Sequence, residues 1–432
     1  MDATKYIKAL ISGGSDLRTL SIILSMLISL TIPYTASGQT DPSLVAAFIR
    51  DGDLWIIKGS EEQLVTKKKE ISGPRWSDDG KWLAYLEGEE KQNIWLYNLE
   101  SRKKELFFKG DASNIQWAPK KNSLAFQVGE TLYLKNINSE TAKPIASDVG
   151  NYSWFPTGNG FLTSTNSELT PDGWTDIEFY KIILENNQIK KTDFFKLPAL
   201  TLENDEFGIG TSIFKWSPDE KWISFIKYPT ASLSADANIL YVLSSNEKQL
   251  IKLNQMLNEP SWFRWAPNHN SLAYIGGVNR ISIMNKFLQV KELPASKQGT
   301  FTPDGYVDRD FTWHNDQLIT VARSKESDWS NDPAQRPLPA LYQIDLKNKE
   351  QKKITNPKNG FGDFTPHYLP GSNRLIWVRT NRKNNNVWIA EENGKHAKVW
   401  ISNIDQGGNF YEKWDWSNVL SIYIPKEVSI RP

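Results

Sequence analysis

The sequence predicts an all-β protein in which one four-stranded unit is repeated along nearly the whole chain. Three observations predict this fold class. A short pattern recurs: a Trp, then a turn rich in Pro and polar residues, then an apolar strand with an aromatic residue near its end. Its copies stand 37 to 62 residues apart, and four short strands with their turns need about 40–50. The composition of 18 Trp, 15 Tyr and 19 Phe with 26 Gly and 22 Pro is typical of many strands separated by turns.

The repeat is clearest at Trp76 (WSDDGKWLAYLE) and Trp216 (WSPDEKWISFIK). Further copies begin at Trp117, Trp154, Trp265, Trp313, Tyr368 and, in degenerate form, Trp416. We take the strand after each anchor as the inner strand of its unit, beginning near Ala46, Leu83, Leu124, Phe161, Ile223, Leu272, Leu318 and Leu375. Such units cannot bury both faces alone, so they stack radially. We therefore expect a β-propeller of four-stranded antiparallel blades, interpreted as eight blades, with seven as the alternative.

The remaining strands follow in the same order in each unit. A second strand is visible at 53–58, 93–99, 131–137, 177–184, 238–244, 280–285, 340–346 and 386–392. A third is visible in several units, at 62–66, 104–108, 352–355 and 397–402, and the fourth runs into the next Trp. Leu420 to Ile424 is a ninth candidate, which we expect to tie the C-terminus to the first blade. No linker divides the body, so residues 39–432 are expected to form one domain.

The turn and strand of the best copies resemble the TolB-type, WD-like propeller repeat, over residues of about 45 to 424. This resemblance implies a propeller, and it implies no catalytic residues. The family it points to is functionally mixed, with partner binding in envelope complexes, scaffolds beside peptidase domains and glycan-related proteins.

The first 38 residues have the order of a secretory signal peptide. Arg18 precedes an uncharged apolar run, Leu20 to Ile32, and Ala36-Ser37-Gly38 follows as a small-residue cleavage site. We expect export to the periplasm, cell wall or exterior, with a mature N-terminus near Gln39. The alternatives are a retained N-terminal anchor, the one membrane attachment that we expect, or a buried helix of the domain.

Charge and cysteine content narrow the function classes. Of 51 basic and 50 acidic residues, the first 38 positions hold three and two, which leaves a neutral body with 48 of each. Such a body lacks the basic footprint of a nucleic-acid-binding protein. With no Cys, disulfides, thiolate catalysis and Cys-ligated zinc are excluded.

The long connections between strands are not randomly distributed. In an up-and-down blade, the first-to-second and third-to-fourth connections lie on one face. Six long segments belong to these two classes: 166–176, 199–211, 228–237, 324–339, 356–366 and 380–385. Because insertions in repeats often mark the binding face, we expect the functional site there, with undirected loop drift as the alternative.

Candidate binding residues lie in these connections. Trp174 and Trp329 stand beside acids and can stack on a sugar or anchor a peptide, unless each folds back on its own loop. Arg side chains and a Lys can accept a carboxylate or phosphate, unless they form a solvated charge run. The candidates are Asp172, Trp174, Asp176, Asp328, Trp329, Asp332, Arg336 and Arg382, with Arg379 and Lys383 as further cations.

Other sites are weaker. Glu203, Asp205 and Glu206 could bind calcium through oxygens but lack the spacing of a calcium loop, and we expect no other cofactor or metal. The segment 306–311 holds Asp308, Arg309 and Asp310, for which we favour an ion pair between blades over a ligand of the axial channel. No nucleophile elbow, P-loop or dinucleotide motif occurs, so we expect no enzyme. The leading hypothesis is an envelope module or scaffold that binds a protein or peptide; the alternative is a glycan-binding or glycan-active protein using carboxylates and stacking Trp.

Overall fold

The computed structural model describes residues 44–67, 69–88, 92–186, 188–201, 206–295 and 298–425. The expected signal peptide, 1–38, lies outside the described residues and stays a prediction. In the described ranges, no helix has the length and apolar character needed to span a membrane. The helical segments found there are short 3₁₀ turns: η2 (Ala231–Ala235), η3 (Pro260–Trp262), η4 (Pro333–Gln335) and η5 (Pro370–Ser372).

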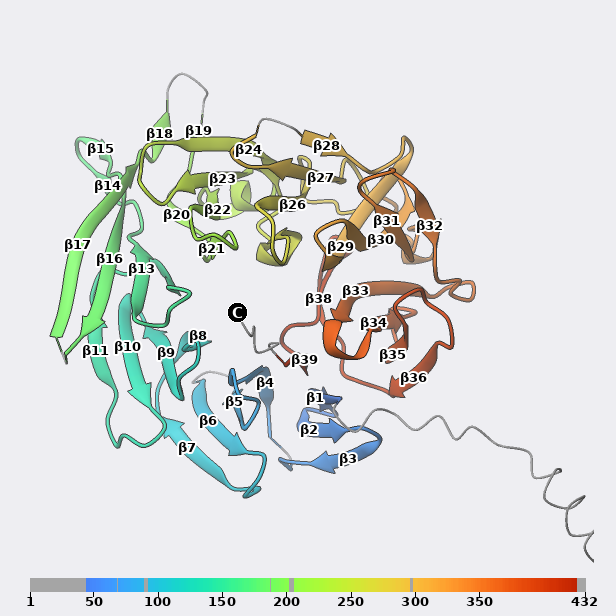
Figure 1. Ribbon diagram of the computed structural model, residues 1–432, viewed down its shortest axis with the longest axis horizontal. Helices are drawn as coiled ribbons and strands as arrows, with labels where there is room; N and C mark the ends of the chain where they lie inside the picture. Colours follow the sequence, from blue (N-terminus) through green and yellow to red (C-terminus); the bar gives the residue numbers. More distant parts are fainter. Residues whose placement is uncertain are drawn as a thin grey trace, which may run out of the picture. The chain divides into compact units, whose positions relative to one another are not determined.

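Eight antiparallel sheets form an eight-bladed propeller over the described part of the chain (Figure 1), which confirms the fold class and makes the seven-bladed alternative wrong. Each blade is given from the axis outward. Blade 1 holds β39 (Leu420–Tyr423), β1 (Val45–Arg50), β2 (Asp53–Lys58) and β3 (Glu61–Leu64); blade 2 holds β4 (Ile71–Trp76), β5 (Trp82–Glu87), β6 (Asn93–Asn98) and β7 (Lys104–Phe108). Blade 3 holds β8 (Ser113–Trp117), β9 (Ser123–Val128), β10 (Thr131–Asn136) and β11 (Lys143–Ala146); blade 4 holds β12 (Asn151–Trp154), β13 (Gly160–Ser164), β16 (Ile177–Glu185) and β17 (Gln188–Leu197).

The innermost strand of blade 5 is broken in two, and both pieces pair with its second strand. The blade holds β20 (Gly210–Thr211) with β21 (Lys215–Trp216), then β22 (Trp222–Tyr228), β23 (Asn238–Ser244) and β24 (Leu250–Met256). Blade 6 holds β25 (Phe263–Trp265), β26 (Ser271–Gly276), β27 (Phe287–Glu292) and β28 (Gln298–Thr300); blade 7 holds β29 (Tyr306–Asn315), β30 (Leu318–Lys325), β31 (Ala340–Asp345) and β32 (Gln351–Lys353); blade 8 holds β33 (Gly362–Leu369), β34 (Arg374–Thr380), β35 (Asn385–Glu391) and β36 (Lys398–Ile401).

The blade boundaries are shifted by one strand from those we expected. The strand that ends in the repeat Trp is the innermost strand of its blade, as β4 is, and the strand beginning near Leu83 is the second. The sequence shows the hairpin of these two strands but not which of them faces the axis. The closing role of Leu420 to Ile424 is confirmed, because β39 pairs with β1 and completes blade 1.

The repeat Trp residues occupy equivalent places. Trp76 stands opposite Leu83 in its sheet, as Trp216 stands opposite Ile223. Most of these indole N–H groups donate to a backbone carbonyl in the innermost strand of the preceding blade. The acceptor is usually the residue just before the repeat Trp of that blade. The bonds run from Trp76 to Ser421 (3.0 Å), Trp117 to Arg75 (2.9 Å), Trp154 to Gln116 (3.3 Å), Trp265 to Lys215 (3.1 Å) and Trp313 to Arg264 (3.1 Å).

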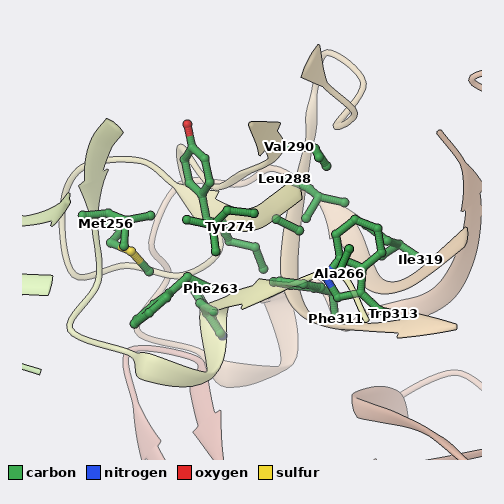
Figure 2. Packing of buried hydrophobic residues seen from close by; sticks show 14 of the residues in the cluster. Met256, Phe263, Ala266, Tyr274, Leu288, Val290, Phe311, Trp313 and Ile319 are labelled. Atoms are coloured by element: carbon green, nitrogen blue, oxygen red, sulfur yellow. The ribbon is translucent and has the colours of Figure 1, made fainter. Parts of the chain in front are cut away.

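Apolar side chains fill the spaces between neighbouring blades. Between blades 5, 6 and 7, Met256 and Phe263 pack on one side of Tyr274, and Ala266 lies beside Trp313 (Figure 2). These side chains are at most 8% exposed. Burial of a large apolar side chain stabilises the fold by about 1.5–3 kcal/mol, so each blade depends on its neighbours for its core.

The prediction of a strand at 280–285 is wrong. This segment is a loop, and β27 takes its place in blade 6. Positive φ angles of 65° at Asn279 and 52° at Asn285 bend the backbone away from an extended form. Inside the loop, the buried Lys286 ammonium donates to the carbonyls of Val278 (2.8 Å), Asn279 (3.1 Å) and Met284 (2.9 Å).

The long connections still share one face. Because strands alternate in direction, the connections from the second to the third strand and from the outermost strand to the next blade lie on the same side. The shift by one strand places all six predicted segments in these two classes. Two more belong there, 277–286 and 402–419. We call this side the long-loop face.

Candidate functional site

The connections of blades 6, 7 and 8 are bonded to one another on the long-loop face. Ser327 N donates to the carbonyl of Ile283 (3.1 Å), and Asp363 N donates to the carbonyl of Pro339 (2.8 Å). Segment 402–419 joins them, since Ile404 N donates to the carbonyl of a blade 8 residue, Asn385 (3.0 Å). These segments therefore form one continuous surface.

A small hairpin stands on this surface. β37 (Gly408–Phe410) and β38 (Lys413–Asp415) pair with each other and with none of the described blade strands. Both turn residues have positive φ, 49° at Tyr411 and 65° at Glu412. A two-residue turn of this kind normally contains Asn-Gly or Asp-Gly, and a left-handed backbone costs another residue about 1–2 kcal/mol. Contacts of the two side chains with the ring must offset this cost.

Glu412 provides the main contact. Its carboxylate is 0% exposed and lies 3.2 Å from Arg336 Nη1 and 3.2 Å from Arg382 Nε, with Arg382 Nη2 3.3 Å from the second oxygen. The buried Arg309 of β29 donates to the Glu412 carbonyl at 3.5 Å. Burial lowers the pKa of Arg309 to about 10, and the Glu412 carboxylate opposes that shift. The Glu412 carboxylate is therefore bonded to two guanidinium groups, from blades 7 and 8, and is attracted electrostatically to a third, that of Arg309.

Tyr411 adds an aromatic contact. Its ring centroid lies 5.2 Å from that of Trp329 in the blade 7 connection. The guanidinium of Arg336 lies 3.7 Å from the Trp329 ring centroid, within the range of a cation–π interaction. Arg336 thus contacts both Trp329 and the hairpin carboxylate.

The hairpin is also attached toward blades 5 and 6. Lys413 forms an ion pair of 2.8 Å with Glu259. Ser282 donates to the Tyr411 carbonyl through its backbone N–H (3.1 Å) and its hydroxyl (3.0 Å). The hairpin therefore bridges connections from four blades.

A cavity of about 1090 Å³ lies between the connections of blades 7 and 8 and the hairpin. Five basic and two acidic residues line it: Arg336, Lys353, Lys358, Arg382 and Lys383, with Asp332 and Glu412. No ion pair is found for the three lysines among the described residues. The excess of positive charge gives the cavity a potential that attracts anionic groups.

The structure brings several predicted site residues together here. Arg336, Arg382, Asp332 and Lys383 line the cavity, and Trp329 packs on Arg336. Asp328 is exposed in the same connection. Whether these residues bind a ligand stays a prediction.

Arg379 does not reach this site. It donates to the two oxygens of the fully buried Asp363, at 2.6 Å and 2.9 Å, and lies 4.2 Å from the Trp388 ring centroid. Its role is structural within blade 8.

The second predicted cluster lies elsewhere. Trp174 is in a small hairpin of the blade 4 connection, formed by β14 (Leu169–Thr170) and β15 (Gly173–Trp174). It packs on Phe207, with 5.1 Å between ring centroids, and Phe207 belongs to the neighbouring hairpin of β18 (Leu200–Thr201) and β19 (Glu206–Phe207). Asp172 and Asp176 are exposed beside it. Three blade positions separate this cluster from Trp329, so the structure does not bring the two Trp together.

The proposed calcium residues are only partly described. Glu203 and Asp205 lie outside the described residues, and Glu206 is buried and bonded to Tyr241 and Lys252. Among the described residues, no group of three or more acids or His could hold a metal ion. The calcium hypothesis is thus untested.

The segment 306–311 holds an ion pair, but inside one blade: Asp308 pairs with Arg323 of the adjacent strand at 2.5 Å. Asp310 instead accepts hydrogen bonds from Trp262 Nε1 (2.7 Å) and from Thr365 of blade 8. Burial raises the pKa of Asp310 to about 6.

Four residues of this site were not predicted from the sequence: Tyr411, Glu412, Lys353 and Lys358. The available signal was the length of segment 402–419 and the Gly407-Gly408 pair before an alternating NFYEKW. The repeat pattern does not include residues 402–415, and it resumes only with the degenerate copy at Trp416.

No family model matches the chain, and no curated protein sequence matches it. Several solved structures share the fold. Dihydro-heme d1 dehydrogenase NirN in complex with DHE is similar with a TM-score of 0.56 and 13% identity, over 89% of this chain and 78% of that chain. A crystal structure of the eukaryotic initiation factor has a TM-score of 0.53 and 12% identity, over 85% and 98%. A putative TolB from Agrobacterium tumefaciens has a TM-score of 0.39 and 11% identity, over 88% and 96%.

At these identities the similarity shows the fold alone. TolB proteins are among several kinds of propeller that resemble the chain, so the likeness does not single out the TolB-type repeat. The comparisons also correct our expectation that the chain is not an enzyme. A dehydrogenase carries the same fold, so neither the propeller nor the missing motif excludes catalysis.

Proposed function

We propose that the protein is exported and binds a partner protein or peptide on the long-loop face, with the cavity between blades 7 and 8 as the contact site. The observation that carries this proposal is that cavity of about 1090 Å³, lined by five basic and two acidic residues. Insertions that project from a rigid repeat ring are a common place for partner binding.

The lining favours a peptide over a glycan. A glycan site needs open aromatic faces near paired carboxylates. Here Arg336 covers the Trp329 ring and Tyr411 contacts its side. The cavity walls are basic, and the Asp332 carboxylate accepts from Ala334 N within its own turn.

Affinity capture from envelope extracts, followed by loop shortening, tests the binding proposal. Replacing 328–335 by a short Gly-Ser turn removes Trp329 and one wall of the cavity. The matched control shortens 168–175, a hairpin of the same face in blade 4. We expect the captured partner to be lost with the first variant and kept with the second, while both unfold at temperatures close to that of the wild type. Equal retention by both folded variants would remove the proposal.

Export has a separate test. N-terminal sequencing of the protein from the envelope or culture fraction should give a start near Gln39. Recovery of the full chain from the cytoplasm, starting at Met1, would contradict export without affecting the binding site.

A further inference from the structure

The site between blades 7 and 8 already holds a carboxylate from its own chain. Arg336 and Arg382 bind the Glu412 carboxylate at 3.2 Å each, and Tyr411, the preceding residue, contacts Trp329. Recognition therefore has two points, an acidic side chain on two arginines and an aromatic side chain on an indole. The two points are adjacent in sequence.

The hairpin that supplies these groups is attached by side-chain and loop contacts and not by pairing with a described blade strand, although Trp414 in its second strand is buried. It adds no strand to any described blade. Its Phe410 and Tyr411 are 45% and 36% exposed. Its turn holds Tyr411 and Glu412 at positive φ, a conformation that favours Asn and Gly. The backbone of the tip is bonded to Ser282 and Arg309, whereas its two side chains make the contacts that a ligand would also make. Strained backbones of this kind often occur at ligand clamps.

The site also has more basic than acidic side chains, which favours binding of a further acidic group. Glu412 faces Arg309, Arg336 and Arg382, and the adjoining cavity adds Lys353, Lys358 and Lys383. Asp332 is the other carboxylate in the lining. An acidic ligand would place its charge where the protein has unbalanced positive charge.

We propose that this site binds an acidic protein segment in which an aromatic residue precedes Asp or Glu, and that Glu412 and Tyr411 occupy its place until the segment displaces the hairpin. The inference rests on the proposed function, because it names the chemistry of the partner at that same face. Hairpin release exposes Arg336 and Arg382 and enlarges the cavity, and no covalent step is involved.

A turn substitution tests this inference. The variant Tyr411→Asn/Glu412→Gly keeps a favourable two-residue turn and removes both anchors. The probe is a cyclised peptide with the sequence of residues 408–415, and the control probe has Gln in place of its Glu. We expect the probe to bind the variant about tenfold or more tightly than the wild type, and the Gln probe to bind at least about tenfold more weakly, as expected for loss of a bond between charged groups.

A second variant, Glu412→Gln, guards against misfolding of the first and should also bind the probe more tightly than the wild type. Equal binding of the Glu and Gln probes to either folded variant would overturn the inference. Its failure is separable from failure of the proposed function. If the probe binds as expected but loop shortening leaves partner capture unchanged, the ligand class stands and the proposed function falls. If the probe fails while capture depends on 328–335, this inference alone falls.

Discussion

The indole N–H of Trp265 donates to the backbone carbonyl of Lys215 at 3.1 Å and so joins the innermost strands of blades 5 and 6. The same N–H lies 3.0 Å from the hydroxyl of Ser224 in β22. Since most repeat anchors make the equivalent bond to the preceding blade, the Trp of the repeat is both core and connector. This dual role explains why Trp, rather than Phe, recurs there.

Trp265→Phe should therefore destabilise the protein more than the smaller size of Phe alone would, because Phe has no N–H donor. The change removes the indole donor that the Lys215 carbonyl and the Ser224 hydroxyl share, and leaves the 3.2 Å bond that this hydroxyl donates to that carbonyl. Loss of such a hydrogen bond costs about 0.5–1.5 kcal/mol, and urea unfolding measures it. Trp216→Phe is the matched control, because Trp216 has the same register and no indole hydrogen bond to any described residue. Equal losses in the two variants would show that the indole bonds contribute nothing.

Closure by β39 should decide the stability of the whole ring. A chain that ends at Asn418 lacks the strand that pairs with β1 and the Ser421 carbonyl that accepts from Trp76. We expect a large fall in the unfolding temperature and rapid proteolysis of blade 1. A chain that ends at Pro425 keeps β39 and should unfold like the full chain. Similar behaviour of both truncations would contradict closure through this strand.

Two arginines three positions apart should have separable roles. Arg379→Gln leaves the fully buried Asp363 without its cation, and breaking a buried pair in this way costs about 3–5 kcal/mol. It should leave partner capture intact at temperatures where the variant is folded. Arg382→Gln should weaken capture with a smaller loss of stability, because Arg336 still faces Glu412. Thermal unfolding and capture, measured together, check both; a reversed pattern would place the site elsewhere.

Asp310 should make stability depend on pH. Because burial raises its pKa to about 6, the folded protein holds this proton more tightly than the unfolded chain does. Its contribution is complete below about pH 4 and is lost as the pH rises to about 6. The unfolding free energy of the wild type, measured relative to that of Asp310→Asn, should thus fall by about 2–3 kcal/mol as the pH rises from about 4 to about 7. If the difference in unfolding free energy between the two proteins stays constant or rises with pH, the pKa of Asp310 is not raised by burial.

The repeat could be predicted because each copy contains its own strand-forming pattern. Trp76 and Trp216 occupy equivalent places as predicted, and the eight copies together predicted the correct blade count. The sequence could not show whether the strand that ends in the repeat Trp is the last strand of one blade or the first strand of the next. Both assignments contain the same hairpins. The loop 280–285 alternates like a strand, and the buried ammonium of Lys286 that organises it leaves no mark in the pattern.

The site was only half predictable. Arg336, Arg382 and Trp329 stood out because they lie in long insertions. Glu412 did not, because its partners are 76 and 30 residues away and the contact depends on how three insertions fold together. Arg379 looked equivalent to Arg382 in sequence, but it lies within β34, where its side chain meets the buried Asp363.

The most direct measurement of partner binding at the long-loop face is site-specific photocrosslinking of the captured partner. A crosslinking residue at Lys383 stands on the wall of the cavity, and one at Lys347 stands in a connection on the opposite face of blade 7. Both positions are exposed. We expect a crosslink to the partner from position 383 and none from position 347. A crosslink from 347 with none from 383 would contradict it.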